Sequence, residues 1–331
     1  MFFTAVGVSS ATEIIALVQK CVGPSYDVTG DTASLEANED DENGGRTDDE
    51  RRAADIESAL KNSGVAAIVA LRGGAWFTRV LSRIDFRVLD HRTRPVAFFG
   101  FSELTTLVNI VAAHPMGRGF YGMGPAFLTY GLKRYAAKNA ESDSEIGTDT
   151  AAWIERETPR QFRAYFEQVT AMLEGREPAP TVEADCVSEL GPLEGPISLW
   201  GGNLTVLSTM IGTRLDPVSA RKGHWLVLED FNDKIERFDR FLSHLTLSGV
   251  WDNLSGILLG DFHDKDRDLT PSVLRLLHYH LPPARKIPIL STPAVGHVWP
   301  MTPLPLFSDG RLRLENDRRY TLSWESKSTK P

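Results

Sequence analysis

Two continuous apolar runs constrain the fold of this chain more than any other feature. Residues 65–71 (Val-Ala-Ala-Ile-Val-Ala-Leu) and 95–99 (Pro-Val-Ala-Phe-Phe) show no alternation of polar and apolar side chains, which is typical of strands covered on both faces. Each run leads into a glycine-containing tripeptide, Arg-Gly-Gly at 72–74 and Gly-Phe-Ser at 100–102, and the second is followed by apolar residues at helical spacing. Buried strands that alternate with helices predict an α/β fold, with a parallel sheet between two layers of helices.

The rest of the N-terminal part fits the same pattern. Residues 2–8 are expected to form a first buried strand, which a polar turn connects to a helix around Ile14. Residues 28–50 hold few large apolar groups and an acidic cluster, so we expect a mobile surface loop there. The capping-box pattern at 47–50 then predicts a helix that stops near Gly64.

The length of the chain favours two domains, because 331 residues exceed what one ordinary core serves. We place an N-terminal α/β domain at 1–140, a polar inter-domain linker at 141–190 and a smaller, strand-rich C-terminal domain at 191–325. The elements expected in the C-terminal domain are strands at 225–228, 257–259 and 287–290 and a helix at 235–245.

Charge and cysteine content exclude several classes of protein. The chain has 36 Lys and Arg against 44 Asp and Glu, a formal net charge of −8, so nucleic acid is not an expected partner. Cys21 and Cys186 are far apart and lack metal-ligand spacing, so we expect reduced thiols and neither a disulfide nor a zinc site. The apolar run at 2–8 is too short to span a bilayer and has no basic leader, so neither a membrane span nor a signal peptide is expected.

Ser102 is the first candidate for a reactive group. It lies between the apolar run at 95–99 and a helix, where a hydroxyl projects from the carboxyl edge of a sheet and nearby N–H groups can stabilise an oxyanion. The local pattern differs from the Gly-x-Ser-x-Gly of common hydrolases, however, and a serine at a helix start is often an N-cap. The local sequence alone favours the cap and leaves the nucleophile as the alternative.

Six short motifs follow one another along the chain. They are Arg72-Gly73-Gly74, Gly100-Phe101-Ser102-Glu103-Leu104, Trp200-Gly201-Gly202-Asn203-Leu204, Gly212-Thr213, Leu228-Glu229-Asp230 and Gly296-His297. In their order, and in covering nearly the whole chain, they resemble the motif series of the LD-carboxypeptidase (muramoyltetrapeptide carboxypeptidase) and microcin-immunity family of serine peptidases. The expected architecture is then an N-terminal parallel-sheet sandwich of the flavodoxin or glutamine-amidotransferase type, with a smaller, swivelling β-barrel-like C-terminal domain.

The resemblance implies a catalytic triad of Ser102, Glu229 and His297. In such a triad the serine attacks a peptide carbonyl, the histidine takes its proton and later returns it, and the glutamate fixes the imidazole. The resemblance also implies an oxyanion hole formed by the loop at Gly74 and the N–H of Glu103.

Gly73 and Asn203 are assigned by the same resemblance to substrate binding. Each residue has a structural alternative: a tight turn at Gly73-Gly74, a helix cap at Asn203, a surface acid at Glu229 and an ordinary loop histidine at His297. The chain departs from the family at two places. Gly73-Gly74-Ala75-Trp76 stands where Gly-Gly-Tyr-Gly is usual, and Glu103 replaces the more usual Asp.

The function that the resemblance implies is a cytoplasmic, homodimeric serine carboxypeptidase without a cofactor or metal. It would hydrolyse an L,D-peptide bond and release the terminal D-alanine of a murein tetrapeptide, a step of peptidoglycan recycling. An alternative substrate is the amide of a microcin-type peptide-nucleotide.

Three further interpretations belong to other classes. A non-catalytic binding protein of the same fold is favoured by Ala75-Trp76 and by the acidic stretch at 36–50. A flavodoxin-like nucleotide binder is disfavoured, because residues 8–11 lack a phosphate-cradling glycine motif. The segment Asp-Phe-His-Asp at 261–264 has ligand-like residues but no clear further partner, so we interpret it as a solvated loop rather than a metal site.

Overall fold

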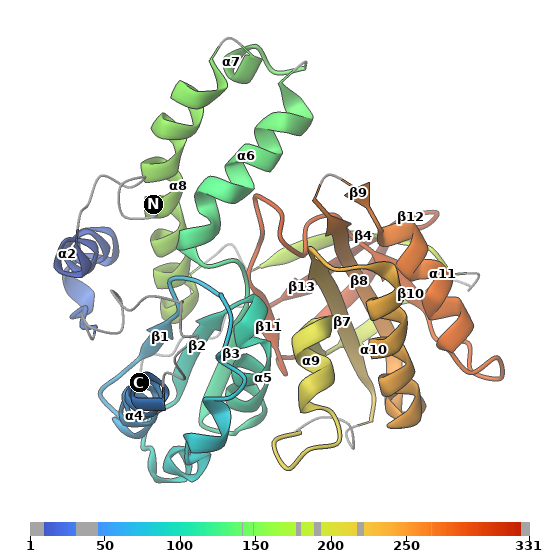
Figure 1. Cartoon of the computed structure of the whole chain (residues 1–331), viewed down its shortest axis with the longest axis horizontal. Coiled ribbons are helices and arrows are strands. Elements are labelled where there is room, and N and C mark those ends of the chain that lie inside the picture. The colour runs from blue at the N-terminus through green and yellow to red at the C-terminus, as the bar shows by residue number, and fades with distance from the viewer. Residues whose placement is uncertain are drawn as a thin grey trace.

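One large sheet runs through both halves of the molecule (Figure 1). The computed structural model describes residues 10–30, 46–140, 142–147, 149–176, 180–188, 193–216, 222–265 and 267–325. In spatial order the strands are β1 (Ala67–Val69), β2 (Val96–Gly100), β3 (Gly117–Tyr121), β11 (Leu304–Leu306), β6 (Leu199–Asn203), β7 (His224–Phe231), β8 (Leu254–Asp264), β10 (Ile289–Ser291), β4 (Thr181–Cys186), β13 (Arg319–Trp324), β12 (Gly310–Asn316) and β5 (Gly195–Ile197), with β9 (Arg267–Asp268) paired to β8.

Two groups of parallel strands make up most of this sheet. β1, β2 and β3 form the first group, and β6, β7, β8 and β10 form the second. The short strand β11 joins them, antiparallel to β3 and parallel to β6. The remaining strands pair in antiparallel fashion beyond β10. The prediction of an α/β fold with a parallel sheet is confirmed.

Helices cover both faces of β2, as its continuous apolar run predicts, whereas β1 is only partly buried. β2 is buried along its whole length. On one face, Phe99 packs in a core with residues of α2 (Ala11–Val22) and α8 (Thr150–Glu174). On the other face, Phe98 packs in a core with residues of α5 (Thr105–Ala113). The helix expected from 47 begins at Arg46 as α4 (Arg46–Lys61). The expected strand at 2–8, and residues 31–45 of the expected acidic loop, lie outside the described residues.

The segment at 141–190, which we expect to connect the domains, holds regular structure in its described part. It contains α7 (Ser144–Gly147), the long helix α8 and strand β4. Helix α8 packs against α6 (Leu128–Asn139) and α2, and with α6 it extends above the N-terminal strands (Figure 1). Among the described helices, none combines the length and the apolar character that a membrane crossing requires. The domain boundaries themselves stay a prediction.

The C-terminal half repeats the strand-then-helix pattern on one side of the sheet. β6, β7 and β8 lead into α9 (Leu204–Met210), α10 (Ile235–Leu247) and α11 (Thr270–His280), whose apolar faces share one core with these strands. On the other side, Val227 and Leu258 pack in a core with Leu312 and Leu322 of the antiparallel strands, which therefore cover this face. The strands predicted at 225–228, 257–259 and 287–290 form as β7, β8 and β10, and the helix predicted at 235–245 forms as α10.

A buried arginine fixes the C-terminal end of α4 and the loop that connects α4 to β1. Arg92 is 5% exposed, and its guanidinium donates to the carbonyl oxygens of Leu60 (2.7 Å), Asn62 (2.8 Å) and Val65 (2.7 Å). A cation at a helix C-terminus also opposes the negative end of the helix dipole. Arg92 therefore stabilises the connection between α4 and β1.

Replacing Arg92 with Met should lower the free energy of unfolding by about 2–4 kcal/mol, since it leaves several buried carbonyl groups without a donor. Urea denaturation at pH 7 measures the change. The matched control is Arg87→Met, because the Arg87 side chain is 84% exposed in its pair with Asp85 and solvent-exposed ion pairs add little to stability. Equal effects of the two substitutions would contradict this role of Arg92.

Candidate active site

Ser102 sits at a sharp turn with an unusual backbone conformation. It directly follows β2 and Phe101, and it opens the short helix η4 (Ser102–Leu104) that continues into α5. Its φ angle is 58°, in the left-handed region that disfavours residues other than glycine. The alternative that Ser102 caps the helix is wrong, because Phe101 occupies the N-cap position and Ser102 lies inside the turn. Strained serines at strand-to-helix turns are typical of nucleophiles whose hydroxyl must face a cleft.

Two neighbours hold Ser102 in this conformation. Gly73 lies so close that a Cβ on it would come within 3.0 Å of the Ser102 Cβ and 3.2 Å of the Phe101 carbonyl oxygen. The Thr105 hydroxyl donates to the Ser102 carbonyl oxygen at 2.6 Å. The glycine at 73 is therefore required by the close approach of the 72–74 loop to the serine.

Glu229 and His297 form a buried pair. Glu229 is in β7 and 0% exposed, and His297, in the loop after β10, is 2% exposed. The His297 Nδ1 lies 2.9 Å from the Glu229 Oε2. The alternatives of a surface acid at Glu229 and an ordinary loop histidine at His297 are therefore both wrong.

The second oxygen of Glu229 is bound by a residue that sequence reasoning missed. The Tyr121 hydroxyl, at the end of β3, donates to Glu229 Oε1 at 2.6 Å, and the Ser102 backbone N–H lies 3.4 Å from the same hydroxyl oxygen. Burial, and then the charge of Glu229, raise the pKa of Tyr121 well above its usual value. Tyr121 thus stays protonated and donates to the carboxylate.

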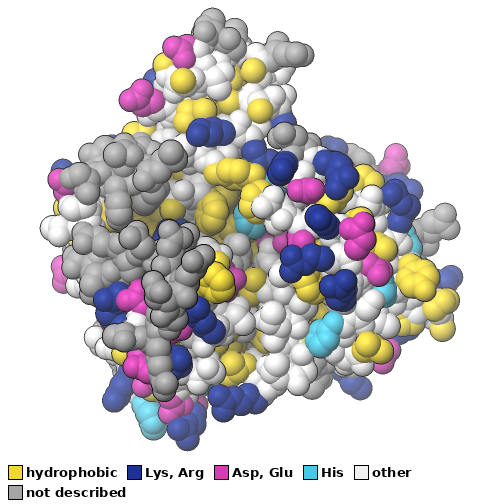
Figure 2. Space-filling model, in the orientation of Figure 1, with side chains coloured by type: hydrophobic (Ala, Val, Ile, Leu, Met, Phe, Trp, Pro, Cys, Tyr) yellow, Lys and Arg dark blue, Asp and Glu magenta, His cyan; other side chains and the backbone are white. Residues whose placement is uncertain are grey.

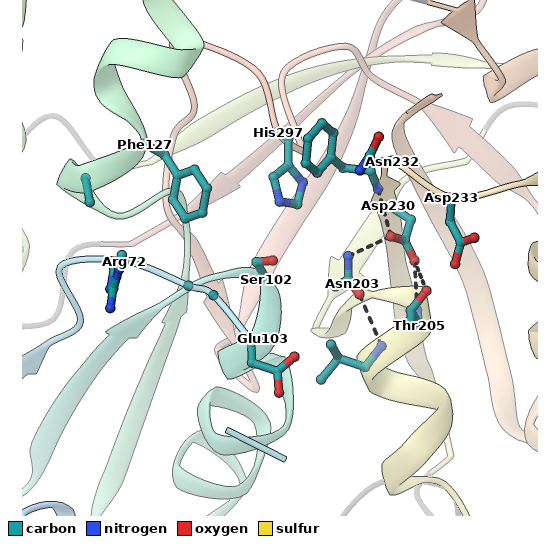
Figure 3. A pocket seen from close by; sticks show the side chains of 15 residues that line it. Arg72, Ser102, Glu103, Phe127, Asn203, Thr205, Asp230, Asn232, Asp233 and His297 are labelled. Carbon is teal, nitrogen blue, oxygen red and sulfur yellow. Dashed lines mark hydrogen bonds between the residues drawn. The ribbon is translucent and has the colours of Figure 1, made fainter. Parts of the chain in front are cut away.

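Aromatic rings enclose the imidazole of His297. The ring centroids of Phe101 and Phe231 both lie 4.6 Å from that of His297, the latter nearly stacked, and Phe127 meets it edge-on at 5.8 Å. In Figure 3 the imidazole points toward Ser102. The rings leave His297 little freedom to rotate, so Glu229 and the aromatic wall together define where its Nε2 points.

A pocket of 550 Å³ opens in front of these residues. Its walls hold the predicted Gly73, Gly74, Ser102, Glu103, Asn203 and His297, together with Arg72, Ala126, Phe127, Thr205, Val206, Asp230, Phe231, Asn232 and Asp233. Glu229 lies behind His297, where an orienting acid belongs.

On the face drawn in Figure 2, hydrophobic side chains and a histidine are visible near the middle, and several Lys and Arg side chains lie on the C-terminal half. The pocket combines one guanidinium with several carboxylates.

Asn203 is both a helix cap and a pocket residue. Its Oδ1 accepts from the Val206 N–H at 3.1 Å, as the cap alternative predicts, and its Nδ2 donates to Asp230 Oδ1 at 3.0 Å (Figure 3). Asp230 Oδ2 accepts from the N–H and the hydroxyl of Thr205, at 2.8 and 2.7 Å. Burial, and then the charge of Glu229, raise the pKa of Asp230 to about 6 despite these donors.

A polar bridge joins the helix after Ser102 to strand β6. The side chain of Asn109 in α5 donates to the Gly201 carbonyl oxygen and accepts from the Gly201 N–H, both at 2.9 Å. One turn earlier, the Thr105 hydroxyl accepts from the Asn203 N–H at 3.1 Å. These bonds place Ser102 and Asn203 on opposite walls of one pocket.

The loop at 72–78, where the sequence departs from the family pattern, is bonded to the residue after the serine. Trp76, at a position where glycine is usual in the family, has a φ of 69° and is 51% exposed, and the Arg79 guanidinium lies 5.3 Å from its ring centroid. Glu103 Oε1 accepts from the N–H and the hydroxyl of Thr78, at 2.9 and 3.1 Å. The loop is thereby tied to the residue after the serine.

The interpretation of residues 261–264 as a solvated loop is wrong. They form the end of β8, and His263 is 1% exposed with its Nδ1 2.5 Å from Asp261 Oδ2. Within the described ranges, no group of three or more His, Cys, Asp or Glu side chains is arranged to hold a metal ion. Phe262 and His263 are neighbours on opposite faces of the strand and both are buried, so both faces of β8 are covered here.

Of the site residues that sequence reasoning missed, Tyr121 and Asp230 had a partial signal. Asp230 follows Glu229 at the end of a predicted strand. Tyr121 ends the run Gly-Arg-Gly-Phe-Tyr, which forms β3 beside the strand predicted at 95–99. Side chains at the carboxyl ends of parallel strands are the ones that build sites in α/β sheets. Thr205 had no signal beyond its place in a helix start.

The fold and site define a class of hydrolase with a strained serine facing a histidine–carboxylate pair. Comparison with known proteins identifies it: the family model described as the LD-carboxypeptidase N-terminal domain matches residues 5–122, and that of the LD-carboxypeptidase C-terminal domain matches residues 197–312. The chain belongs to the LD-carboxypeptidase family of serine peptidases.

Relatives and solved structures agree with this membership. The chain is 26% identical to a probable murein peptide carboxypeptidase of Bacillus subtilis (78% of this chain, 72% of the relative) and 26% identical to a murein tetrapeptide carboxypeptidase of Pseudomonas aeruginosa (80% and 79%). The fold is that of a muramoyltetrapeptide carboxypeptidase from Oxalobacter formigenes (TM-score 0.58, 24% identity, 85% and 84% covered). It is also that of the microcin C7 self-immunity protein MccF in complex with aspartyl sulfamoyl adenosine (TM-score 0.59, 18% identity, 85% and 82% covered).

Replacing Tyr121 with Phe should reduce kcat for peptide hydrolysis by about 10- to 100-fold, because a buried hydrogen bond to a charged group is worth about 1.5–3 kcal/mol. Steady-state kinetics measure the change, and KM should stay within about twofold. Tyr320→Phe is the control, since Tyr320 is equally buried but its hydroxyl accepts from the Leu193 N–H. A kcat for Tyr121→Phe that equals that of the control would show that Glu229 needs no second partner.

Asp230 should make the protein less stable as the pH rises. Its folded pKa of about 6 exceeds the reference value of 3.8, so the folded state holds the proton more tightly. The associated stability is present below pH 3.8 and is lost as the pH rises to about 6, a loss on the order of 2–3 kcal/mol. Urea unfolding of wild type and Asp230→Asn from pH 4 to 7 should show this slope in wild type only. Parallel curves for the two proteins would contradict it.

Proposed function

We propose that the protein is a serine LD-carboxypeptidase that releases the terminal D-alanine from a murein tetrapeptide, as a step of peptidoglycan recycling. The observation that carries this proposal is the buried Glu229–His297 pair, which presents an imidazole to Ser102 across a pocket. The murein peptide carboxypeptidases among its relatives support the choice of substrate.

The roles in this reaction follow from the contacts. Ser102 attacks the carbonyl carbon of the bond before D-alanine while His297 accepts the hydroxyl proton. The bond to nitrogen then breaks as His297 returns that proton to the leaving amine, and a water molecule repeats the cycle on the acyl-enzyme. Glu229, held by Tyr121, keeps the proton of His297 on Nδ1 and offsets the positive charge that forms on the ring.

The oxyanion hole is proposed at Gly74 and Glu103, on either side of Ser102. Both residues line the pocket, and the bonds from Thr78 to Glu103 fix the two segments relative to each other. Backbone N–H groups fixed in this way stabilise the charge that develops on the carbonyl oxygen without reorganising during the reaction.

Substrate recognition is proposed to use the remaining pocket walls. A carboxypeptidase must bind the terminal carboxylate of its substrate, and the Arg72 guanidinium at the pocket wall can do so. Asn203, held by Asp230, offers the opposite wall. Gly73 lets the substrate backbone approach Ser102, because no side chain intervenes.

We also propose the cytoplasm as the site of action and a homodimer as the active form. Both come from the family resemblance. The thiols of Cys21 and Cys186 are free, which suits a reducing compartment.

Replacing Ser102 with Ala should abolish release of D-alanine from a murein tetrapeptide while leaving Tm nearly unchanged, because the hydroxyl makes no large packing contribution. Replacing it with Gly should abolish activity and raise stability by about 1 kcal/mol, since glycine adopts a φ near 58° without strain. Amino-acid analysis of the released D-alanine and thermal unfolding measure the two effects.

Two outcomes would overturn the proposal. Full activity of Ser102→Ala would exclude the serine mechanism. Hydrolysis of an aspartyl-adenylate analogue, with an untouched tetrapeptide in a parallel assay, would instead assign the site to peptide-nucleotide hydrolysis.

A further inference from the structure

A second histidine–carboxylate pair lies directly behind the wall of the active site. His263 and Asp261, both on β8, are bonded through Nδ1 and Oδ2 at 2.5 Å, and the Tyr130 hydroxyl of α6 lies 3.4 Å from the His263 Nε2. The Phe231 ring separates this pair from the catalytic one, with centroids 4.9 Å from His263 and 4.6 Å from His297. The mechanism proposed above uses none of these polar groups.

Arg134 connects the second pair to the loop that carries His297. Its Nη1 donates to the His297 carbonyl oxygen at 2.6 Å and lies 3.3 Å from Asp261 Oδ2. Its side chain is 19% exposed and that of Asp261 is 12% exposed, so solvent screens this charge pair less than a surface pair. Arg134 is part of α6, in the N-terminal half, whereas both of its partners belong to the C-terminal half.

Asp261 also holds the His297 loop through its backbone. The Asp261 N–H donates to the Val295 carbonyl oxygen at 2.7 Å. Gly296, with a φ of 133°, is so close that a Cβ on it would lie 3.0 Å from the Asp261 Cβ. The residues just before His297 are therefore seated on β8, and Arg134 fastens the carbonyl of His297 itself.

The charges of this cluster are balanced in a way that keeps Asp261 ionised. Burial alone would raise the pKa of Asp261, but its contacts with His263 and Arg134 outweigh burial and lower it. An ionised Asp261 attracts the Arg134 guanidinium and orients it toward the His297 carbonyl oxygen. His263 and Tyr130 complete the set of polar groups around this carboxylate.

We propose that Arg134 is a positioning residue for His297, whose backbone it holds in place relative to Ser102 by bonding the His297 carbonyl oxygen and Asp261 at once. Glu229 sets the rotation and tautomer of the imidazole, whereas Arg134 sets the position of the backbone that bears it. Since Arg134 comes from the half that carries Ser102, it fixes the two halves of the site relative to each other. This inference rests on the proposed role of His297 as the base.

Arg134 does not line the pocket in the described structure, so its loss should change turnover rather than substrate binding. A displacement of about 1 Å between a nucleophile and its base can cost about 100-fold in rate. We therefore expect Arg134→Met to lower kcat by about 10- to 100-fold with KM within about twofold.

The experiment compares Arg134→Met, Arg134→Lys and Arg134→Ala with the neighbouring control Lys133→Met, whose side chain is exposed on the same helix. Lysine should restore part of kcat, and added guanidinium should restore part of it in Arg134→Ala. A merely structural role predicts neither recovery. All variants are assayed well below their Tm. If Arg134→Met does not fold, Asp261→Asn takes its place in the comparison. This substitution keeps the side-chain volume and should show the same loss of kcat.

A second readout needs no turnover. The Nδ1 proton of His297, bonded to Glu229, should give a downfield proton resonance in the wild type that shifts or broadens in Arg134→Met and not in Lys133→Met. A kcat and a resonance that both match wild type in Arg134→Met, while His297→Ala is inactive, would overturn this inference and leave the proposed function intact. Wild-type protein that releases no D-alanine would refute the proposed function, and the resonance would still decide on Arg134.

Discussion

The buried carboxylate of Glu229 is the constraint on which the rest of the site depends. An ionised carboxylate without exposure to water is strongly unfavourable unless both oxygens are paired. One oxygen is bound by Tyr121, 108 residues away in the sequence, and the other by His297, 68 residues away. Three separate segments therefore meet at one point beside the core around β7. The contacts that satisfy this charge are also those that build the proposed catalytic pair.

The two halves of the molecule are joined around this point by polar bonds as well as by apolar packing. The Asn109 side chain bridges α5 to both backbone groups of Gly201, and Thr105 links Ser102 to Asn203. Hydrogen bonds depend on direction and distance far more steeply than hydrophobic contacts do. Apolar burial can bring the halves together, but the polar bridge sets their position relative to each other. A site divided between two halves of a chain needs this relative position to be fixed.

Local pattern was sufficient where burial is decided within one element. The apolar run at 95–99 correctly predicts a strand that is covered on both sides, whereas the run at 65–71 forms the predicted strand but is only partly buried. The same reasoning failed at 261–264, where the polar residues on either side of Phe262 suggested solvent. There, burial is created by α6, whose Arg134 lies 127 residues away from Asp261 in the sequence, and by the loop before His297. The sequence pattern did not predict the roles of Tyr121 and Arg134 for the same reason. Their partners are set by the order of strands in the sheet, which no window of sequence contains.

Backbone strain marks the two segments between which the oxyanion hole is proposed. Ser102 and Trp76 both have φ angles in the left-handed region, at 58° and 69°, and such conformations persist only where surrounding contacts enforce them. For Ser102 these contacts are the close approach of Gly73 and the bond from Thr105. For Trp76 the guanidinium of Arg79 lies over the ring, while Thr78 is bonded to Glu103. A glycine at position 76, the residue usual in the family, would reach this conformation without strain. The departure from the family pattern at this position is compatible with the proposed oxyanion hole, because N–H groups are placed by the backbone and the exposed indole lies outside the pocket walls.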